Sequence, residues 1–207
     1  MKSPDNRSWW LRGASYCLIA AGLGLLIYVS TQYLTMYREQ RRLVREWQQQ
    51  QDQPLTSVAL KSSHNQAGLT RITIARINLD AVVTEGTGRS QLLVGPGHMQ
   101  ETAEPGEPGN TVITAHRDTF FRHIYELNPG DMIELRRNGA LYRYVVTGKR
   151  VVAPSDLSVA QPTPDARLTL ITCYPTYFVG PAPERLVVFS RLLEQSGTSS
   201  SGTLGNP

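Results

Sequence analysis

The stretch RLTLITCYPTYFVGPAPERLVVFSRLL, residues 167–193, decides the fold of this chain. Its first part is apolar and rich in β-branched residues, which predicts a strand that ends on Cys173. Prolines and a glycine then predict a turn-rich connection, and a second apolar strand begins at Arg185. We therefore expect the thiol and the guanidinium side by side at one rim of a sheet, where a nearby cation favours the nucleophilic thiolate.

The alternative for Cys173 is a packing role, because free cysteines are often small buried residues of a core. The second cysteine of the chain, Cys17, lies inside a long apolar run near the N-terminus. Cys173 therefore has no partner for a disulfide within the folded domain. In a domain that faces an oxidising compartment, an unpaired thiol favours a reactive role over a packing role.

The apolar run covers residues 14–36, and no charged residue lies between Arg12 and Arg38. A membrane-spanning helix needs about 20 mostly apolar residues, so the run predicts a transmembrane helix. No A-x-A type cleavage site closes the run, which favours an uncleaved anchor over a signal peptide. Basic residues flank the run on both sides, so the charge pattern alone does not orient the helix.

The net charge of +4 is concentrated near this run, since residues 1–50 hold seven basic and three acidic residues. Such a basic flank is typical of membrane anchors and does not indicate nucleic-acid binding. The chain is expected to divide as follows: an N-terminal segment 1–13, the transmembrane helix 14–36, a stalk and linker 37–69, a folded domain 70–194, and a Gly/Ser/Thr-rich disordered tail 195–207.

The folded domain is predicted to be all-β. Its expected strands cover residues 71–77, 81–85, 110–116, 131–136, 141–152, 167–173 and 185–193. Asn138 and Gly139 form a strong hairpin signal between two of them. We expect a short helix over residues 120–127 and a helical turn over 154–159. Seven or eight short strands with one or two helical insertions predict a closed β-barrel.

A candidate partner for the thiol follows another apolar strand. Residues 111–115, TVITA, have a buried-strand pattern and are followed by His116. Cysteine nucleophiles are commonly activated by a histidine that is distant in sequence but adjacent in the fold. The other histidines do not stand at the end of such a strand, and surface or structural roles are expected for His64, His98 and His123.

Three motifs together resemble the sortases, which are membrane-anchored cysteine transpeptidases with an eight-stranded barrel. These are TLITC at 169–173, the arginine at 185 and TAHRDTFF at 114–121. The resemblance covers nearly all of residues 70–193. Two further segments look most like the class D branch, GPGH at 95–98 and PGEPGN at 105–110. The resemblance implies a single-pass protein with a cytoplasmic N-terminus and an extracytoplasmic catalytic domain.

The resemblance also implies roles for individual residues. Cys173 would attack the threonine carbonyl of an LPXTG-like sorting signal and form a thioacyl-enzyme. His116 would protonate the leaving amine and then accept a proton from the incoming amine. Arg185 would donate hydrogen bonds to the substrate backbone or the oxyanion. Thr172 and Ala115 are expected to line the substrate site, although Ala115 stands where the family has glycine.

The expected partners are proteins that carry the sorting signal, an amine acceptor such as a peptidoglycan precursor, and the membrane. No cofactor or metal is expected, and we interpret Glu101, Glu104 and Glu107 as solvated residues rather than calcium ligands. Arg117 is expected to act mainly on stability, while Asp118 would either orient the histidine or cap a helix. The linker has no Asp-Pro lid motif with an aromatic residue, which favours anchoring of single proteins over pilin polymerisation.

Two alternative functions stay open at this stage. Another extracytoplasmic cysteine acyl-transferase or peptidase, such as an L,D-transpeptidase, would have a Ser-His-Gly-Cys cluster, whereas here Cys173 follows Thr172. A non-catalytic anchored β-barrel that binds a partner would have no reason to keep a thiol, an imidazole and a guanidinium at matching strand ends.

Overall fold

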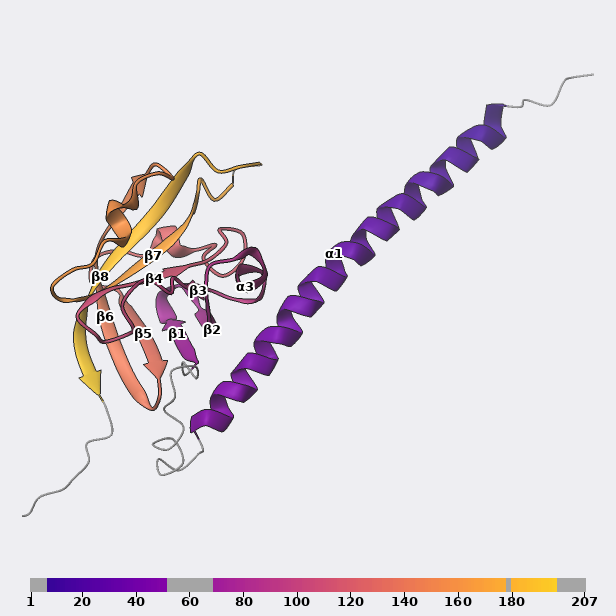
Figure 1. The fold of residues 1–207 in the computed structure, drawn as a ribbon. Helices are drawn as coiled ribbons and strands as arrows, with labels where there is room; N and C mark the ends of the chain where they lie inside the picture. Colours follow the sequence, from indigo (N-terminus) through magenta and orange to yellow (C-terminus); the bar gives the residue numbers. More distant parts are fainter. Residues whose placement is uncertain (1–6, 52–68, 178–179, 197–207) are drawn as a thin grey trace, which may run out of the picture. The chain divides into compact units, whose positions relative to one another are not determined.

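The computed structural model describes residues 7–51, 69–177 and 180–196. It forms two compact units, residues 1–39 and 40–207, and the ribbon is shown in Figure 1. Residues 52–68 of the predicted stalk and linker lie outside the described residues, as does the predicted tail from residue 197 onward. The tail was predicted to start at residue 195, but the last strand includes Gln195 and Ser196.

The N-terminal element is one continuous helix, α1, over Arg7–Gln51. It contains the whole predicted transmembrane segment and the helical stalk. The helix is long enough, and an 18-residue window of it is apolar and poor enough in charge, to cross a membrane. A helix satisfies its own backbone hydrogen bonds, as a segment in lipid must. By length and composition α1 is therefore a candidate membrane span.

The remaining elements form the folded domain. Its strands are β1 (Thr70–Ile74), β2 (Leu79–Glu85), β3 (Gly97–His98), β4 (Gly109–Thr114), β5 (Met132–Arg137), β6 (Ala140–Val152), β7 (Ala166–Tyr174) and β8 (Glu184–Ser196). Short helical segments stand between them, namely η1 (Ala75–Ile77), α3 (Arg89–Val94), η2 (Ile124–Glu126) and η3 (Leu157–Ala160).

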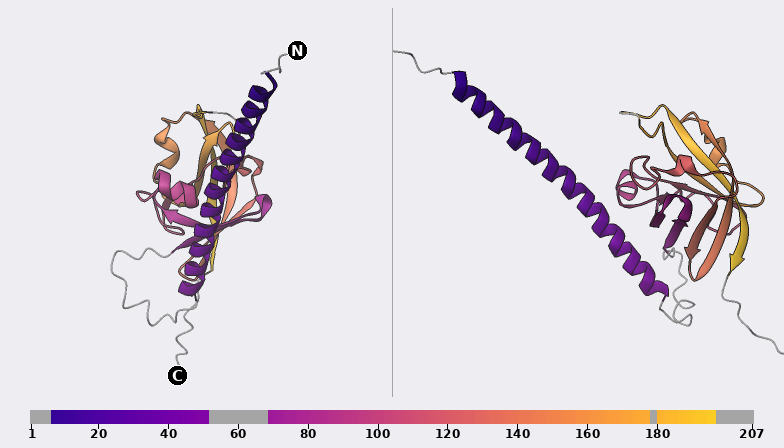
Figure 2. Two further views of the ribbon diagram at one scale, coloured as in Figure 1. Left: turned by 90° about the vertical axis from the view of Figure 1, so that its right-hand side faces the viewer. Right: turned by 180° about the vertical axis from the view of Figure 1, so that it is seen from behind.

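The eight strands close into a barrel in the order β1-β2-β3-β4-β7-β8-β6-β5, with β5 pairing back to β1. Figure 2 shows the barrel from two further sides. The pairs β2–β3 and β4–β7 are parallel, and the other pairs are antiparallel. The prediction of a closed eight-stranded barrel with short helices is confirmed.

The local predictions had mixed outcomes. The β5–β6 hairpin is confirmed, since Asn138 and Gly139 have φ values of 51° and 78°, as a type I′ turn requires. The helix predicted over residues 120–127 is confirmed only in part, because turns occupy residues 120–123 and the 3₁₀ helix η2 is limited to Ile124–Glu126. The physical reason is the spacing of Phe121, Ile124 and Leu127, all fully buried, which matches the three-residue period of a 3₁₀ segment.

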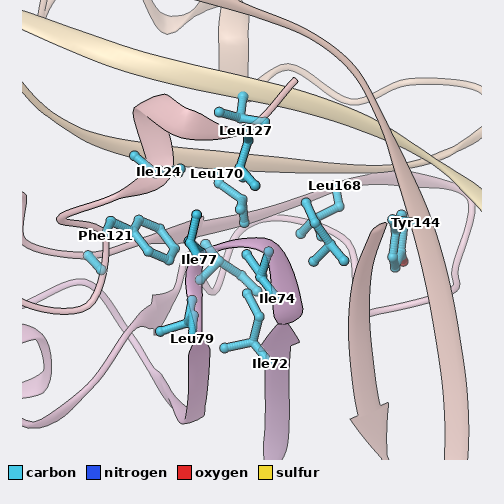
Figure 3. Close-up of a cluster of buried hydrophobic side chains, with 14 of the residues drawn as sticks. Ile72, Ile74, Ile77, Leu79, Phe121, Ile124, Leu127, Tyr144, Leu168 and Leu170 are labelled. Carbon is cyan, nitrogen blue, oxygen red and sulfur yellow. The ribbon is translucent and has the colours of Figure 1, made fainter. Parts of the chain in front are cut away.

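The main core fills the barrel. Alternate strand residues point inward, such as Ile72 and Ile74 from β1 and Leu168 and Leu170 from β7. Figure 3 shows that the connection after β4 covers this core with Phe121, Ile124 and Leu127. Burying one such side chain contributes about 1.5–3 kcal/mol, so the segment that follows His116 is firmly anchored.

A second, smaller cluster lies on the outer face of the β7–β8 sheet. It contains the buried residues Val152, Val159 and Val187, with Ile171 and Phe189 packed against them. Side chains alternate between the two faces of a strand, so odd-numbered residues of β7 and β8 lie on this outer face while Leu168, Leu170, Leu186 and Val188 lie inside. Cys173 and Arg185 are odd-numbered and therefore belong to the outer face.

Candidate active site

The centre of the candidate site is a cross-strand pair. Cys173 near the end of β7 lies directly opposite Arg185 near the start of β8. Directly opposed residues have Cβ atoms about 4.5–5.5 Å apart and point to the same face. Cys173 is a free thiol, and both residues are half-buried, so they remain accessible from outside the barrel. The sequence prediction that these two groups share one rim of the sheet agrees with this register.

His116 joins the pair from the neighbouring strand. Parallel β4 and β7 are in register up to Thr114 and Ile171, and the Ala115 amide donates to the Ile171 carbonyl at 3.2 Å. His116 and Cys173 each lie two residues beyond the last pair of this ladder. The Phe121 amide also donates to the His116 carbonyl at 3.2 Å, so the core connection holds the histidine backbone.

The Arg185 guanidinium is only partly engaged. Its Nη1 atom donates to the carbonyls of Ala182 at 3.3 Å and Glu184 at 2.8 Å. Within the described parts of the chain, its Nε and Nη2 atoms have no hydrogen-bond acceptor. A guanidinium carries five N–H donors in a planar fork, so this side chain can still donate aligned bonds to a ligand.

The two predicted substrate contacts lie beneath this rim. Thr172 and Ala115 are only 2% and 5% exposed. The Thr172 hydroxyl donates to the Ala115 carbonyl at 2.8 Å, which joins the ends of β4 and β7 inside the barrel. The Ala115 methyl group packs within the main core. Both residues thus brace the strand ends that carry His116 and Cys173, and their contact with a substrate stays a prediction.

The other histidines lie elsewhere. His64 is outside the described residues. His123 is exposed and contacts Glu126 at 2.9 Å. His98 is buried, with Nδ1 at 3.0 Å from a Glu85 carboxylate oxygen and Nε2 at 3.2 Å from the Ala103 carbonyl. Burial lowers the pKa of His98, but the hydrogen bond and charge of Glu85 outweigh it and leave that pKa raised. The same hydrogen bond lowers the pKa of Glu85.

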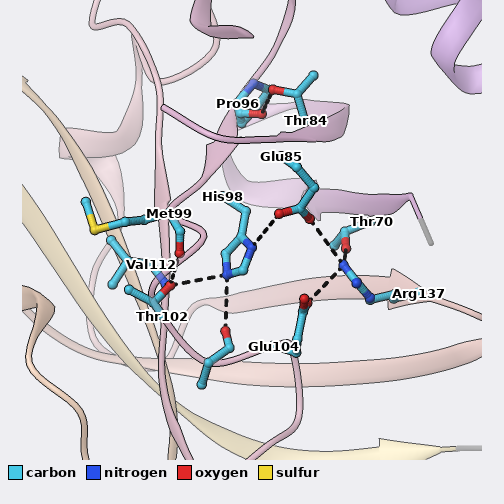
Figure 4. A network of polar contacts seen from close by, with 11 residues as sticks. Thr70, Thr84, Glu85, Pro96, His98, Met99, Thr102, Glu104, Val112 and Arg137 are labelled. Atoms are coloured by element: carbon cyan, nitrogen blue, oxygen red, sulfur yellow. Dashed lines mark hydrogen bonds and ion pairs between the residues drawn. The ribbon is translucent and has the colours of Figure 1, made fainter. Parts of the chain in front are cut away.

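The ligand atoms of Glu85, His98 and Glu104 lie within 4.8 Å of one another, which makes them a candidate metal site. Figure 4 shows that the Arg137 side chain points at the same carboxylates. Its Nη1 atom lies 3.4 Å from Glu85 and 3.0 Å from Glu104. A fixed guanidinium charge already neutralises these carboxylates and opposes a divalent cation. Glu104 is therefore a structural ion-pair partner of Arg137 and not a merely solvated residue, which corrects the sequence interpretation.

Sequence reasoning gave Asp118 and Arg117 minor roles. Asp118 is exposed, and no hydrogen bond joins it to the His116 ring within the described residues. Arg117, in contrast, reaches across to the β7–β8 connection and donates to the carbonyls of Pro175 and Gly180. No local pattern signalled these bonds, because the acceptors are 58 and 63 residues away in sequence.

Comparison with known proteins identifies similar chains. The family model of the sortase domain matches residues 72–193. The chain is 32% identical to Sortase D of Bacillus subtilis over 142 residues, which cover 68% of this chain and 71% of that protein. A Sortase D5 transpeptidase of Clostridium perfringens matches with a TM-score of 0.67 and 26% identity, over 76% of this chain and 99% of that chain. Sortase E of Streptomyces avermitilis matches with a TM-score of 0.56 and 28% identity, over 67% and 95% of the two chains.

Proposed function

The chain belongs to the sortase family and has class D members among its relatives, and we propose on this premise that it is a cysteine transpeptidase in which Cys173, His116 and Arg185 act together. Sortases are membrane-anchored transpeptidases that generally act without a cofactor. The proposed substrates are proteins with an LPXTG-like C-terminal sorting signal. The proposed acceptor is an amine at the cell envelope, such as that of a peptidoglycan precursor.

The observation that carries the proposal is the direct β7–β8 pairing of Cys173 with Arg185 beside the end of β4. A cation next to a thiol favours the thiolate, which is the nucleophilic form. This supports Cys173 as the nucleophile and His116 as the acid and base. Arg185 keeps donors free within the described residues, which supports a role toward a carbonyl or oxyanion.

The proposed reaction has two halves. The Cys173 thiolate attacks the threonine carbonyl carbon of the sorting signal, and the Arg185 donors stabilise the oxyanion that develops. As the C–N bond breaks, His116 protonates the leaving amine, and the acyl group stays on sulfur as a thioester. The acceptor amine then attacks this thioester and gives a proton to His116. A new amide bond forms and the Cys173 thiolate is regenerated.

We also propose a topology. The candidate span in α1 anchors the protein in a single pass, with the N-terminus in the cytoplasm and the barrel outside it. An extracytoplasmic barrel would meet secreted sorting signals and envelope amines on the same side of the membrane. Cysteine labelling with a membrane-impermeant maleimide in intact cells tests this topology, since Cys173 then reacts without lysis.

The proposed chemistry is tested with the full chain in detergent. It is incubated with an LPXTG-type peptide and triglycine, and mass spectrometry follows both the ligated product and the acyl adduct on Cys173. The proposal predicts an adduct of the peptide's acyl part and a product that joins it to triglycine. Peptide binding without any adduct or cleavage would instead identify a binding module.

A further inference from the structure

Arg117 links the two halves of the candidate site. It directly follows His116, and its Nη1 and Nη2 atoms donate to the carbonyls of Pro175 at 3.0 Å and Gly180 at 2.8 Å. These two carbonyls belong to the connection that leads from Cys173 to Arg185. One half-buried side chain thus ties the histidine-bearing segment to the loop between the other two site residues.

The β7–β8 connection needs hydrogen-bond donors from outside the sheet, because the strand ladder does not extend into it. The pairing of β7 with β8 ends at Tyr174 and Glu184. Beyond that point the backbone carbonyls must find donors outside the ladder. A guanidinium presents its N–H groups as a rigid planar fork, so it can hold two carbonyls at a fixed separation, which a lysine ammonium does not reproduce.

We propose that Arg117 is a positioning residue for the transfer reaction, which clamps the β7–β8 connection against the end of β4 and so fixes His116 relative to Cys173 and Arg185. This inference rests on the proposed function. It adds a kinetic role to the stabilising role that the sequence predicted. A misplacement of about 1 Å among reacting groups can lower a rate about 10²-fold, so the clamp affects catalysis without touching the substrate.

The connection has a second tie that offers a comparison. The hydroxyl groups of Tyr125 and Tyr177 lie 3.3 Å apart, and Tyr177 is 79% exposed. One long, exposed hydrogen bond between neutral groups contributes less than two bonds from a charged donor. Tyr125→Phe removes this tie and is expected to change the kinetics much less than a substitution of Arg117.

The test compares full-length variants in detergent at a temperature well below the unfolding midpoint of each. Arg117→Ala is expected to lower kcat/KM for an LPXTG-type peptide about 10–100-fold, mainly through kcat. Hydrogen exchange at the amides of Thr176, Tyr177 and Gly180 should become faster. Arg117→Lys keeps the charge and favours folding if the alanine variant is unstable, yet it should recover little of the rate.

Arg167→Ala is the matched control, because Arg167 is an exposed arginine near the other end of β7 that pairs with Asp165 at 3.1 Å. This substitution should change neither kcat nor the amide hydrogen exchange in the β7–β8 connection. A lower unfolding temperature with unchanged kcat in Arg117→Ala would overturn the positioning role, as would full rescue by lysine or a loss confined to KM. If the wild type itself transfers no peptide, the proposed function fails. If the wild type is active and Arg117→Ala has the same kcat/KM, only the positioning role of Arg117 is refuted.

Discussion

The barrel contains two clusters in which a histidine and an arginine lie near strand ends, and they differ in how their polar atoms are used. In the first, His98 and Arg137 are 3% and 8% exposed, and both have partners in Glu85. In the second, His116 and Arg185 are half-buried, and within the described residues two nitrogen atoms of Arg185 have no acceptor. The same residue types therefore serve a closed structural network in one place and an accessible site in the other.

Residue type alone therefore does not distinguish a structural cluster from a reactive one, whereas the satisfaction of its hydrogen-bond donors and acceptors does. Buried polar groups must be hydrogen-bonded because an unpaired one costs about 1–3 kcal/mol. In the His98 network both ring nitrogens have partners within the chain, and the buried Glu104 oxygen that lacks a hydrogen bond forms an ion pair with Arg137 at 3.0 Å. The rim around Cys173 leaves donors for a ligand, and the only thiol of the barrel stands there.

The largest effect is expected from Cys173→Ala, which removes the nucleophile of the accessible site. Acyl-adduct formation and peptide transfer should disappear, while a small-for-small change at a half-buried strand end should alter the free energy of unfolding by about 1 kcal/mol or less. Mass spectrometry after peptide incubation and a thermal melt measure the two quantities. Retained peptide cleavage by a folded alanine variant would refute Cys173 as the nucleophile.

A smaller loss is expected from Arg185→Lys. If Arg185 acts as a planar fork toward a carbonyl or oxyanion, an ammonium fails to reproduce the aligned donors. Loss of such a donor typically costs about 10²–10³ in rate, so kcat/KM should fall about two orders of magnitude, and Arg185→Ala should be somewhat worse. Steady-state kinetics on an LPXTG-type peptide provide the measurement.

Arg137→Lys is the matched control for this prediction, because it makes the same substitution in the closed network. It should lower the unfolding temperature, since Arg137 contacts Thr70, Glu85 and Glu104, but leave kcat nearly unchanged. If Arg185→Lys keeps most of the activity, Arg185 contributes through its positive charge and not through the geometry of its hydrogen-bond donors. If Arg137→Lys lowers kcat as much as Arg185→Lys does, the distinction between the two clusters is wrong.

The sequence predicted the parts of the fold that depend on local pattern. Alternation located seven of the eight strands, and Asn138-Gly139 located the hairpin. The missed strand, β3, has only two residues and contains Gly97, where a Cβ atom would collide with the Gly86 carbonyl. A glycine required by close backbone approach looks like a turn signal in sequence, so this strand could not be predicted from propensity.

The candidate site also has features that depend on local sequence pattern and features that do not. Cys173, His116 and Arg185 were singled out because each stands next to an end of an apolar strand and within a recognisable motif, and their catalytic roles stay a prediction. The contacts of Arg117 with Pro175, and of Arg137 with Glu104, could not be predicted. Their partners come from other strands or loops, and only the closed barrel brings them together.

The smallest effect concerns the pH dependence of stability in the closed network. The pKa of His98 is raised above 6.5 in the folded protein, because Glu85 and Glu104 favour its charged form despite burial beside Arg137. A raised folded pKa contributes stability that is fully present below the unfolded value and is lost as pH rises through the folded value. The pKa of Glu85 is lowered below 4.5, so its contribution is present above that value and is lost in acid.

His98→Gln removes the titrating group and should therefore flatten the stability curve on the alkaline side of pH 6.5. Thermal melts across a pH series should show the wild type losing its advantage over this variant as pH rises, while both lose stability in acid through Glu85. His123→Gln is the control, since its pair with Glu126 is solvent-exposed and should contribute little at any pH. Parallel curves for the wild type and His98→Gln would mean that His98 is not stabilised in its charged form. That result would also contradict the hydrogen bonds of the closed network, because a neutral imidazole has one N–H and cannot donate to both the Glu85 carboxylate and the Ala103 carbonyl.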